Sequence, residues 1–595
     1  MSPQQPRGCA FLIREVGEEK IFTPEQFTED QRMFAQTADD FMNKEVVPLI
    51  EELEHGAFDK MVGLLHKAAE IGLLMIDIPE EYGGLGVDKT TSMIVTEKLS
   101  LYAGFATSFG AHTGIGTMPL LYFGTPVQKE ALLPRLATGE LLAAYALTEP
   151  GSGSDALAAK TRADLTEDGE HYILNGTKMW ITNAGFADLH TVFAQVDGDK
   201  FSCFLVEADR VGVSVGAEEK KLGLKGSSTR QLNLDKVKIP VTNLLGEVGK
   251  GHKIAFNILN IGRFKLGVGV LGGAKHTLGV AVKYAKERVQ FGQPISDFGA
   301  IRGKIADMAV KLYTLESMCY RVAGYMDQNL STLDSGAPDY PEQAMAAIEE
   351  FAVEDSIMKV FGSEVLDFVV DEALQIHGGY GYSAEYEIER IYRDSRINRI
   401  FEGTNEINRM LIPGMILKRT MKGQLNLFEM IQKVEMALAE PEKPTPPGQD
   451  ADATLAFERF CTEQAKQLVV YCANQAIQKH MADLREQQEI LLLLADMIIE
   501  IYAMDSTVSR TLQIIEEKGY DAARLQRAAT KVSMTYSFQN IRTFAENLLN
   551  HLATGDQLNA HLEAFDQLAF NPRVDIVSLR REIADVVIER ERYIF

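Results

Sequence analysis

The spacing of apolar residues changes along the chain, and each change marks a different kind of element. From about residue 24 to residue 140, apolar residues recur at helical spacing, and Gly-rich joints such as IPEEYGGLGVD (78–88) separate the segments. The tripeptide Gly-Thr-Pro at 124–126 is typical of a helix start. We therefore predict that residues 1–140 form an N-terminal helical domain.

Between residues 141 and 251 the period shortens towards two. The runs HYILNG, ADLHTVFAQV, FSCFLVEA and RQLNLDKVKI alternate or are rich in β-branched residues, and turn residues divide them. They predict a central antiparallel β-domain. Asn-Gly at 175–176 has the composition of a hairpin turn, so we expect KMWIT (178–182) to form the strand that follows. Because side chains alternate along a strand, Trp180 and Thr182 should face the same way.

Helical spacing returns at residue 252, and residues 252–430 predict a helical domain of the four-helix-bundle kind. The run GVGVLG (267–272) matches the dinucleotide pattern GxGxxG. Such a fingerprint has to follow a strand and open a helix, whereas this one lies inside a continuous helical run. We therefore interpret its small residues as a place of close packing or a wide ligand channel.

The C-terminal part also has a helical pattern. A polar, Pro-rich stretch, PEKPTPPGQDAD, falls in a predicted linker (431–452), and residues 453–595 are helical in pattern throughout. Residues of the preceding bundle recur there at identical spacing: Ala306, Asp307, Met308, Tyr313 and Ser317 become Ala495, Asp496, Met497, Tyr502 and Ser506. We interpret residues 453–595 as a degenerate copy of the bundle that packs rather than catalyses, because it lacks the segment FEGT of residues 401–404.

The predicted fold class is therefore α+β multidomain. It comprises a helical domain (1–140), a central antiparallel β-domain (141–251), a four-helix-bundle-like domain (252–430) and, after the linker, an extra C-terminal helical domain (453–595). A chain of 595 residues is too long for one hydrophobic core, which agrees with several domains.

Composition and targeting signals narrow the class of protein. At 46% hydrophobic and 24% charged residues the chain resembles an ordinary soluble protein, and no uninterrupted apolar run reaches the roughly 18 residues of a membrane span. The first 20 residues lack the character of a secretory or transit peptide, so we expect a cytoplasmic protein. The composition leaves peripheral contact with a membrane surface open.

Charge and cysteine content exclude further classes. A formal net charge of -24 argues against a nucleic-acid partner and against a basic membrane-docking surface. The five cysteines form no CxxC pair, which supports neither a disulfide framework nor a metal site. Reduced thiols in a reducing compartment are expected.

One segment, RDSRINRIFEGTNEINR (393–409), carries the candidate catalytic group. Glu402 lies at a joint between two predicted helices, where backbone holds it on both sides. Gly403 lets the chain pass close to a ligand because it has no Cβ. Thr404 is the predicted N-cap of the next helix, with Glu406 in its first turn.

A surface ion pair with Arg396 or Arg399 is the alternative interpretation of Glu402. The wider context favours catalysis. The motif FEGTNEI follows QIHGG (375–379) and, more distantly, KMWITN (178–183) and TEPGSGSD (148–155). In this order, over about residues 27–417, these motifs resemble the acyl-CoA dehydrogenase family. Within the family the chain is most similar to the very-long-chain branch, because a further helical segment follows the core.

The resemblance implies that FAD is the cofactor. An aromatic surface beside a hydroxyl suits an isoalloxazine ring, and Trp180, which would otherwise be read as a core anchor, is implied to lie with Thr182 on the exposed side of the ring. Gly153 and Ser154 are implied to offer a tight loop to phosphate or pantetheine. The residues implied to contact the flavin on this side are Tyr145, Leu147, Thr148, Gly153, Ser154, Trp180, Ile181, Thr182, Thr404 and Glu406.

A second group of residues is implied to bind the adenosine and pyrophosphate of a flavin held mainly by the neighbouring subunit. It comprises Arg288, Gln290, Phe291, Gln375, Gly378 and Gly379. A guanidinium is a natural bidentate partner for phosphate. Many family members have Gln where this chain has Gly299, which leaves that contact open. Such a composite site implies a homodimer.

The implied substrate is an acyl-CoA thioester, with Ser154, Asn260, Arg263 and Gly403 as its binding residues, Asn260 and Arg263 beside the coenzyme A end. Glu402 would remove the α-proton while N5 of the flavin accepts the hydride from the β-carbon next to Thr182. The backbone N–H of Glu402, with a flavin ribityl hydroxyl, would polarise the carbonyl. An acyl chain that expels water should raise the pKa of this carboxyl.

The predicted function is therefore FAD-dependent α,β-dehydrogenation of acyl-CoA, of long chain by its branch, to trans-2-enoyl-CoA in fatty-acid β-oxidation. Electrons would pass to an electron-transfer flavoprotein, near exposed Trp180. Two alternatives are an acyl-CoA oxidase that uses oxygen and a non-catalytic assembly or scaffold protein that retains the fold. Larger family members use a C-terminal extension where shorter ones make tetramer contacts, which again implies a dimer.

Overall fold

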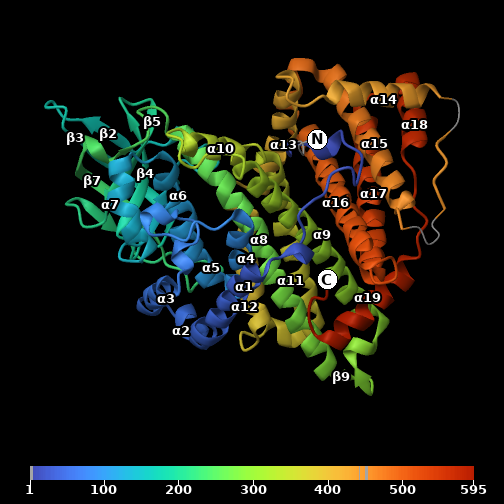
Figure 1. Ribbon diagram of the computed structural model, residues 1–595, viewed down its shortest axis with the longest axis horizontal. Coiled ribbons are helices and arrows are strands. Elements are labelled where there is room, and N and C mark those ends of the chain that lie inside the picture. Colours follow the sequence, from blue (N-terminus) through green and yellow to red (C-terminus); the bar gives the residue numbers. More distant parts are fainter. Residues whose placement is uncertain (1–4, 441–442, 449–452) are drawn as a thin grey trace.

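The computed structural model describes residues 5–440, 443–448 and 453–595. Figure 1 shows three regions: a β-sheet with short helices at one end, long helices through the middle, and a C-terminal group of helices at the other end. The region expected to be helical at the N-terminal side contains α1 (Glu29–Phe41), α2 (Ile50–Glu54), α3 (Phe58–Glu70), α4 (Lys89–Leu99), α5 (Ala103–Gly110), α6 (Met118–Phe123) and α7 (Pro126–Ala137). The helix start predicted at residues 124–126 is confirmed, because the Thr125 side chain accepts a hydrogen bond from the backbone N–H of Gln128 and caps α7.

The segment that precedes α1 is bonded to the C-terminal helices. The backbone N–H and carbonyl of Ile21 are both bonded to the side chain of Gln513, and Lys466 donates to the carbonyl of Arg14. Figure 1 places the N-terminus beside the C-terminal helices. A domain of residues 1–140 was therefore drawn too widely, because the apolar periodicity of so short a segment does not indicate its partner.

The sheet contains β1 (Ala143–Ala146), β2 (Arg162–Leu165), β3 (His171–Thr182), β4 (Leu189–Val196), β5 (Lys200–Glu207), β6 (Val213–Val215), β7 (Thr229–Pro240) and β8 (Leu244–Leu245). Its order is β6-β7-β3-β2-β4-β5-β8, with β1 also paired to β4. Most pairings are antiparallel as predicted, but β1 and β2 both run parallel to β4, so the sheet is mixed.

The predicted hairpin turn at Asn175-Gly176 is wrong. Both residues lie inside the single long strand β3, at a break in its register with β7. The Asn175 side chain accepts a hydrogen bond from the backbone N–H of Lys236. A Cβ at residue 176 would lie only 2.4 Å from the side-chain oxygen of Thr161. The glycine therefore permits close approach of the neighbouring segment at Thr161 and does not form a turn.

Long helices form the middle of the molecule. They are α8 (Gly251–Glu287), α9 (Gly299–Leu330), α10 (Tyr340–Glu349), α11 (Ala352–His377), α12 (Glu387–Ser395) and α13 (Asn405–Met421), with the small ribbon β9 (Val289–Gln290) and β10 (Gln293–Pro294) between α8 and α9. The run at 267–272 lies inside α8, which confirms that it is not a dinucleotide fingerprint.

Helix α8 is apolar and long enough to cross a membrane by length and composition alone. The search for uninterrupted apolar runs missed it. In the fold, 67% of its most apolar window is buried inside the protein. Packing against α4, α9 and α11 therefore accounts for its composition.

The C-terminal region is helical, as predicted. It contains α15 (Ala456–His480), α16 (Gln488–Lys518), α17 (Arg524–Leu552), α18 (Gly555–Leu568) and α19 (Ile576–Arg590). Helix α14 (Leu427–Ala439) occupies the first part of the predicted linker, so residues 431–439 are helical instead. Residues 441–442 and 449–452 of the predicted linker lie outside the described residues.

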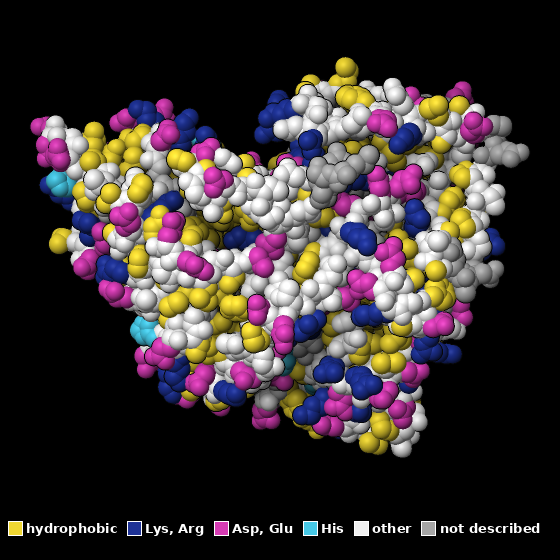
Figure 2. Space-filling view, in the orientation of Figure 1, with side chains coloured by type: hydrophobic (Ala, Val, Ile, Leu, Met, Phe, Trp, Pro, Cys, Tyr) yellow, Lys and Arg dark blue, Asp and Glu magenta, His cyan; other side chains and the backbone are white. Residues whose placement is uncertain are grey.

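The surface reflects the mixed charge of the chain. Figure 2 shows acidic and basic side chains intermixed over the visible face, with a hollow at its upper edge between the sheet region and the C-terminal helices. The charged groups that matter for chemistry are instead buried along α8 and α11.

Candidate functional site

The backbone at Glu402 has an unusual conformation. Its φ is 58°, and that of Gly403 is 81°, so two successive residues lie in the left-handed region. Buried side chains from other elements hold their carbonyl groups. Arg263 Nε of α8 donates to the Glu402 carbonyl (3.2 Å), and Lys359 Nζ of α11 donates to the Gly403 carbonyl (2.7 Å). Asn408 Nδ2 of α13 donates to both, at 3.4 and 2.9 Å.

The Glu402 side chain points into the protein. Its Oε2 atom is enclosed and has no hydrogen-bond partner among the described residues. A Cβ added at Gly262 of α8 would lie 2.4 Å from that oxygen, so glycine makes room for the carboxylate. The alternative of a surface ion pair is not supported, since Arg399 pairs with Asp367.

Burial determines the ionisation of this carboxyl group. It raises the pKa of Glu402 from an ordinary value of 4.5 to about 7, although the positive charges of Arg263 and Lys359 act in the opposite direction. A carboxylate that changes charge near neutral pH, with one oxygen unpaired, is well suited to accept a proton.

Glu402 lies in the wall of a largely apolar cavity of about 200 Å³. Helix α8 forms one side of it, and α4 and α5 of the N-terminal region form another. The residues that line the cavity with Glu402 include Thr182, Gly262, Leu266, Gly269, Gly273 and Leu366. Three glycines on α8 leave room between the side chains that this helix contributes to the lining, such as Leu266.

Thr182 and Trp180 do not follow simple strand alternation. The register of β3 against β7 shifts between Lys178 and Ile181, and Trp180 has a φ of 59°. Thr182 lines the cavity with Glu402, whereas the Trp180 side chain is 60% exposed and Ile181 is buried. An exposed indole beside a hydroxyl at the cavity leaves an aromatic surface open to a planar ligand.

The other residues expected near the flavin ring lie at the end of β1 and just beyond it. Tyr145 Oη is buried without a hydrogen-bond partner among the described residues, and the pKa of Tyr145 is raised by burial and further by the charges of Cys203 and Glu402. The Thr148 carbonyl accepts from the backbone N–H of Met179, which ties this loop to β3. Gly153 and Ser154 are exposed, and a Cβ at Gly153 would meet no atom within 4 Å.

Residues predicted to bind the adenosine end lie together at the far end of α8. The Arg288 guanidinium lies 5.2 Å from the centre of the Tyr380 ring, which directly follows Gly378 and Gly379. Gln375 lies in the last turn of α11, just before these glycines, and Tyr284 Oη donates to the carbonyl of His377. Phe291 is 95% exposed and Gln290 is exposed beside it. In Figure 1 this end, marked by β9, is far from the sheet.

The two residues predicted to bind the coenzyme A end of the substrate, Asn260 and Arg263, contact each other in this structure. Arg263 and Asn260 are buried and bonded to each other, Nη1 to Oδ1 at 3.0 Å, behind Glu402 rather than in the cavity wall. Their contact with a substrate stays a prediction. Thr404 is confirmed as the N-cap of α13, accepting from the backbone N–H of Ile407, with Glu406 in the first turn.

The side chains around the cavity have the chemistry that FAD binding requires. One group of ligand-ready atoms surrounds the cavity: the unpaired Glu402 and Tyr145 oxygens, the Thr182 hydroxyl and the open indole of Trp180. A second group, around Arg288, lies at the far end of α8, about 38 Å of helix beyond Gly262 at 1.5 Å per residue. This division suits an extended dinucleotide cofactor shared by two protomers.

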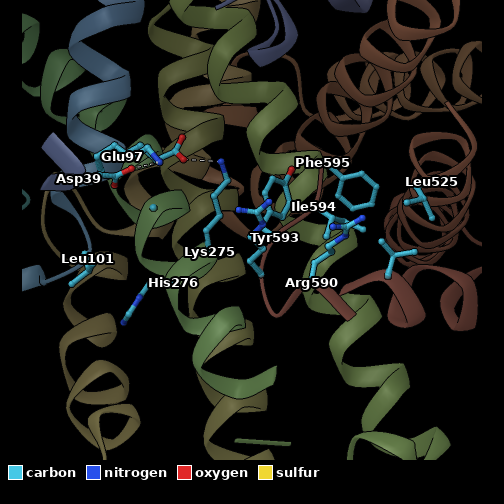
Figure 3. A pocket seen from close by; sticks show the side chains of 14 residues that line it. Asp39, Glu97, Leu101, Lys275, His276, Leu525, Arg590, Tyr593, Ile594 and Phe595 are labelled. Carbon is cyan, nitrogen blue, oxygen red and sulfur yellow. Dashed lines mark hydrogen bonds and ion pairs between the residues drawn. The ribbon is translucent and has the colours of Figure 1, made fainter. Parts of the chain in front are cut away.

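A larger cavity, of about 700 Å³, lies where the C-terminal tail meets α4 and α8. Figure 3 shows Lys275 and Glu97 linked at its edge, with Tyr593, Ile594 and Phe595 of the tail beside them. Lys275 also pairs with Glu316. The carboxylates that line this cavity are paired, unlike Glu402, so the cavity does not offer a free base for proton abstraction.

Sequence reasoning missed three residues of the site. Gly262 lies just before the run of small residues singled out at 267–272, and Lys359 and Asn408 were not singled out. A signal for Lys359 existed, since it is a lone lysine within the largely apolar helical run SIMKVFG (356–362).

Comparisons with known proteins cover almost the whole chain. Residues 28–140 match the acyl-CoA dehydrogenase N-terminal domain, 144–237 the middle domain and 249–416 the C-terminal domain. A second domain description, also named acyl-CoA dehydrogenase C-terminal domain, matches residues 464–566.

Individual relatives agree with these matches. A probable acyl-CoA dehydrogenase of Bacillus subtilis is 47% identical over 99% of this chain and 98% of its own length. The very long-chain specific acyl-CoA dehydrogenase of Rattus norvegicus is 36% identical over 80% of this chain and 73% of its own. A crystal structure of an acyl-CoA dehydrogenase complexed with FAD from Bacillus anthracis has a TM-score of 0.96 at 48% identity, covering 99% of this chain and 100% of that one.

Proposed function

The chain belongs to the acyl-CoA dehydrogenase family of FAD-using oxidoreductases, and from this premise we propose that it converts long-chain acyl-CoA to trans-2-enoyl-CoA with Glu402 as the base. The single observation that carries the proposal is the Glu402 carboxylate. It lies in the wall of an apolar cavity, and one of its oxygens is unpaired among the described residues. Residues 260–262 of α8 include no carboxylate that could act as a base instead.

In this proposal the ionised carboxylate of Glu402 takes the α-proton of the bound thioester. The bound flavin supplies the hydride acceptor. Thr182 orients that acceptor by hydrogen bonding, and the Glu402 backbone N–H stabilises the negative charge that develops on the thioester oxygen. The apolar lining excludes water, which keeps the pKa of Glu402 near 7 and protects the reacting centre.

A long acyl chain is supported by the length of the cavity. Its glycines on α8 run from Gly262, beside the carboxylate, to Gly273. At 1.5 Å per residue this is about 16 Å of helix. The similarity to very long-chain specific enzymes points the same way.

The remaining parts of the proposal concern partners and place. We propose a homodimer, because the exposed group at Arg288 and Phe291 can complete a flavin site only in a second protomer. Exposed Trp180 provides a place for an electron-transfer flavoprotein to approach. The five cysteines are buried and form no disulfide, which is compatible with a reducing cytoplasm. The pathway that we propose is fatty-acid β-oxidation.

The proposal is tested with the purified yellow protein and a series of acyl-CoA chain lengths under anaerobic conditions. We expect the flavin absorbance to bleach on addition of acyl-CoA, fastest with long chains, and light scattering to give twice the chain mass of 66.0 kDa. Oxygen consumption with acyl-CoA and no other acceptor would identify an oxidase instead. An unbleached flavin with every acyl chain would contradict dehydrogenation altogether.

A further inference from the structure

A fully buried lysine lies directly behind the catalytic joint. Lys359 is on α11, and its side chain has no exposed surface. Its Nζ donates to the Gly403 carbonyl and to Asn405 Oδ1, each at 2.7 Å. The lysine therefore connects α11 to the residue after Glu402 and to the first turn of α13.

The acceptors of Lys359 are neutral, which distinguishes it from Lys178, Lys275 and Lys466. Lys178 pairs with Glu149, Lys275 with Glu97, and Lys466 with Asp505. No carboxylate lies within ion-pair distance of Lys359 among the residues that the structure describes. A buried ammonium without a paired carboxylate is costly, so its charge needs another source of compensation.

That source is Glu402. Of the charges that act on Lys359, the carboxylate of Glu402 favours the ammonium form most, followed by Glu406 and Glu364, whereas Arg263 opposes it. Glu402 in turn faces Arg263, Lys359 and the phenol of Tyr145. Asp355, one turn before Lys359 on α11, is buried and faces Glu354 and Arg263; burial and Glu354 raise its pKa well above the ordinary value, whereas Arg263 lowers it.

We propose that Lys359 is a positioning residue for the reaction: it fixes the two left-handed residues that aim the Glu402 carboxylate, and its positive charge allows that carboxylate to be ionised inside the dry cavity. The inference rests on the proposed function of Glu402 as base. Lys359 itself touches no substrate, because it is not part of the cavity wall.

The two groups are coupled in their titration. Burial lowers the pKa of Lys359 to about 7 and raises that of Glu402 to about 7. Each charged form favours the other, so loss of the ammonium raises the pKa of the carboxyl group further. A variant without the charge then needs a higher pH before Glu402 can act as a base.

The test compares Lys359→Met with the wild-type holoenzyme across pH. Two quantities are followed: the rate of flavin reduction by acyl-CoA, and the infrared C=O band of protonated Glu402, assigned by its loss in Glu402→Gln. We expect the acidic limb of the rate profile and the infrared titration both to move up by at least about one pH unit. At pH 7 the rate should fall at least about fivefold and recover in part at higher pH.

Three further variants separate charge from packing. Lys466→Met removes a lysine that is equally buried but belongs to the C-terminal region, and should lower stability without moving either titration. Lys359→Arg keeps the charge and should retain the acidic limb near its wild-type position. Lys359→Gln keeps a hydrogen-bond donor but no charge, and its rate profile and infrared titration should shift as in Lys359→Met. It replaces Lys359→Met in the test if that variant does not fold.

The outcomes distinguish the two proposals. A rate that falls equally at every pH, with an unmoved infrared titration, would reduce Lys359 to a structural role and overturn the inference. If Glu402→Gln still reduces its flavin at the wild-type rate, the proposed base is wrong, whatever the Lys359 variants do.

Discussion

Helices α9 and α16 are related in sequence and packed against each other, yet the proposed base Glu402 belongs to the bundle of α9 and has no counterpart in the sequence of residues 453–595. Figure 1 shows them side by side in the middle of the molecule. Their contacts are reciprocal. Arg321 of α9 donates to Asp505 and Ser506 of α16, and the guanidinium lies 5.1 Å from the Tyr502 ring.

The reverse contact uses the matching positions. Arg510 of α16 donates to Glu316 and Ser317 of α9, and lies 4.5 Å from the Tyr313 ring. Such reciprocity is what two copies make across a two-fold axis. The C-terminal region therefore packs on the bundle as a second copy of that bundle would, which supports the proposal of a dimer rather than a larger assembly.

The two regions differ in how they treat a buried carboxylate. Asp505 accepts from both Arg321 and Lys466, and although burial alone would raise its pKa, these cations hold the pKa below its ordinary value. Glu402 has one oxygen unpaired and a pKa raised to about 7. Paired burial makes a packing element, and unpaired burial at a cavity makes a base.

The largest effect on this comparison is expected from Arg510→Met. The side chain of Arg510 is fully buried and pairs with both Glu25 and Glu316, so its loss leaves Glu25 without its cation and Glu316 with Lys275 alone. We expect the free energy of unfolding to fall by about 3–5 kcal/mol. Chemical denaturation of the holoenzyme measures the change.

Arg485→Met is the matched control, because the side chain of Arg485 is 83% exposed in the same region. It should change stability by less than about 0.5 kcal/mol. Equal stability of the two variants would show that the reciprocal contacts between α9 and α16 contribute nothing measurable.

A smaller effect, of opposite sign in the two regions, is expected when each carboxylate becomes an amide. At pH 8 Asp505→Asn should be less stable than wild type, because two buried cations lose their partner. Glu402→Gln should be more stable by about 3 kcal/mol, because it removes a carboxylate whose pKa folding raises from 4.5 to about 7.

The pH dependence fixes the sign. Ionisation of Glu402 destabilises the fold progressively from about pH 4.5 to pH 7, so the advantage of Glu402→Gln should disappear below that window. Asp505 stabilises the fold above its unfolded pKa, and this contribution should be lost only in stronger acid. Thermal melts from pH 4 to pH 8 should show the advantage of Glu402→Gln disappear while the deficit of Asp505→Asn persists. The same sign for both amides at pH 8 would refute the distinction.

Much of the fold could be predicted because the signals were local. The change of period from helix to strand near residue 141 and back near residue 251 falls in the loop between α7 and β1 and at the start of α8. The prediction of a hairpin at Asn175-Gly176 was wrong because the sequence does not distinguish a Gly that makes room for a neighbouring segment from a Gly that forms a turn. The placement of residues 7–25 depends on contacts more than 300 residues away, such as Ile21 with Gln513.

The candidate site divides in the same way. Glu402, Thr404 and the glycine at 403 could be found in one short motif whose residue types state their backbone roles. A lone lysine in an apolar run marks Lys359, but its role and that of Gly262 exist only where α8 and α11 meet that motif in space. Arg263 donates to the Glu402 carbonyl, a contact that its sequence does not indicate, and its contact with the substrate stays a prediction.

Single-turnover reduction of the flavin in Glu402→Gln tests the central claim most directly. With yellow cofactor bound and acyl-CoA saturating, we predict that the absorbance of the variant bleaches at least about a thousandfold more slowly than that of wild type, because proton transfer by a positioned base contributes about 10²–10⁴ in rate. Bleaching at the wild-type rate would contradict Glu402 as the base.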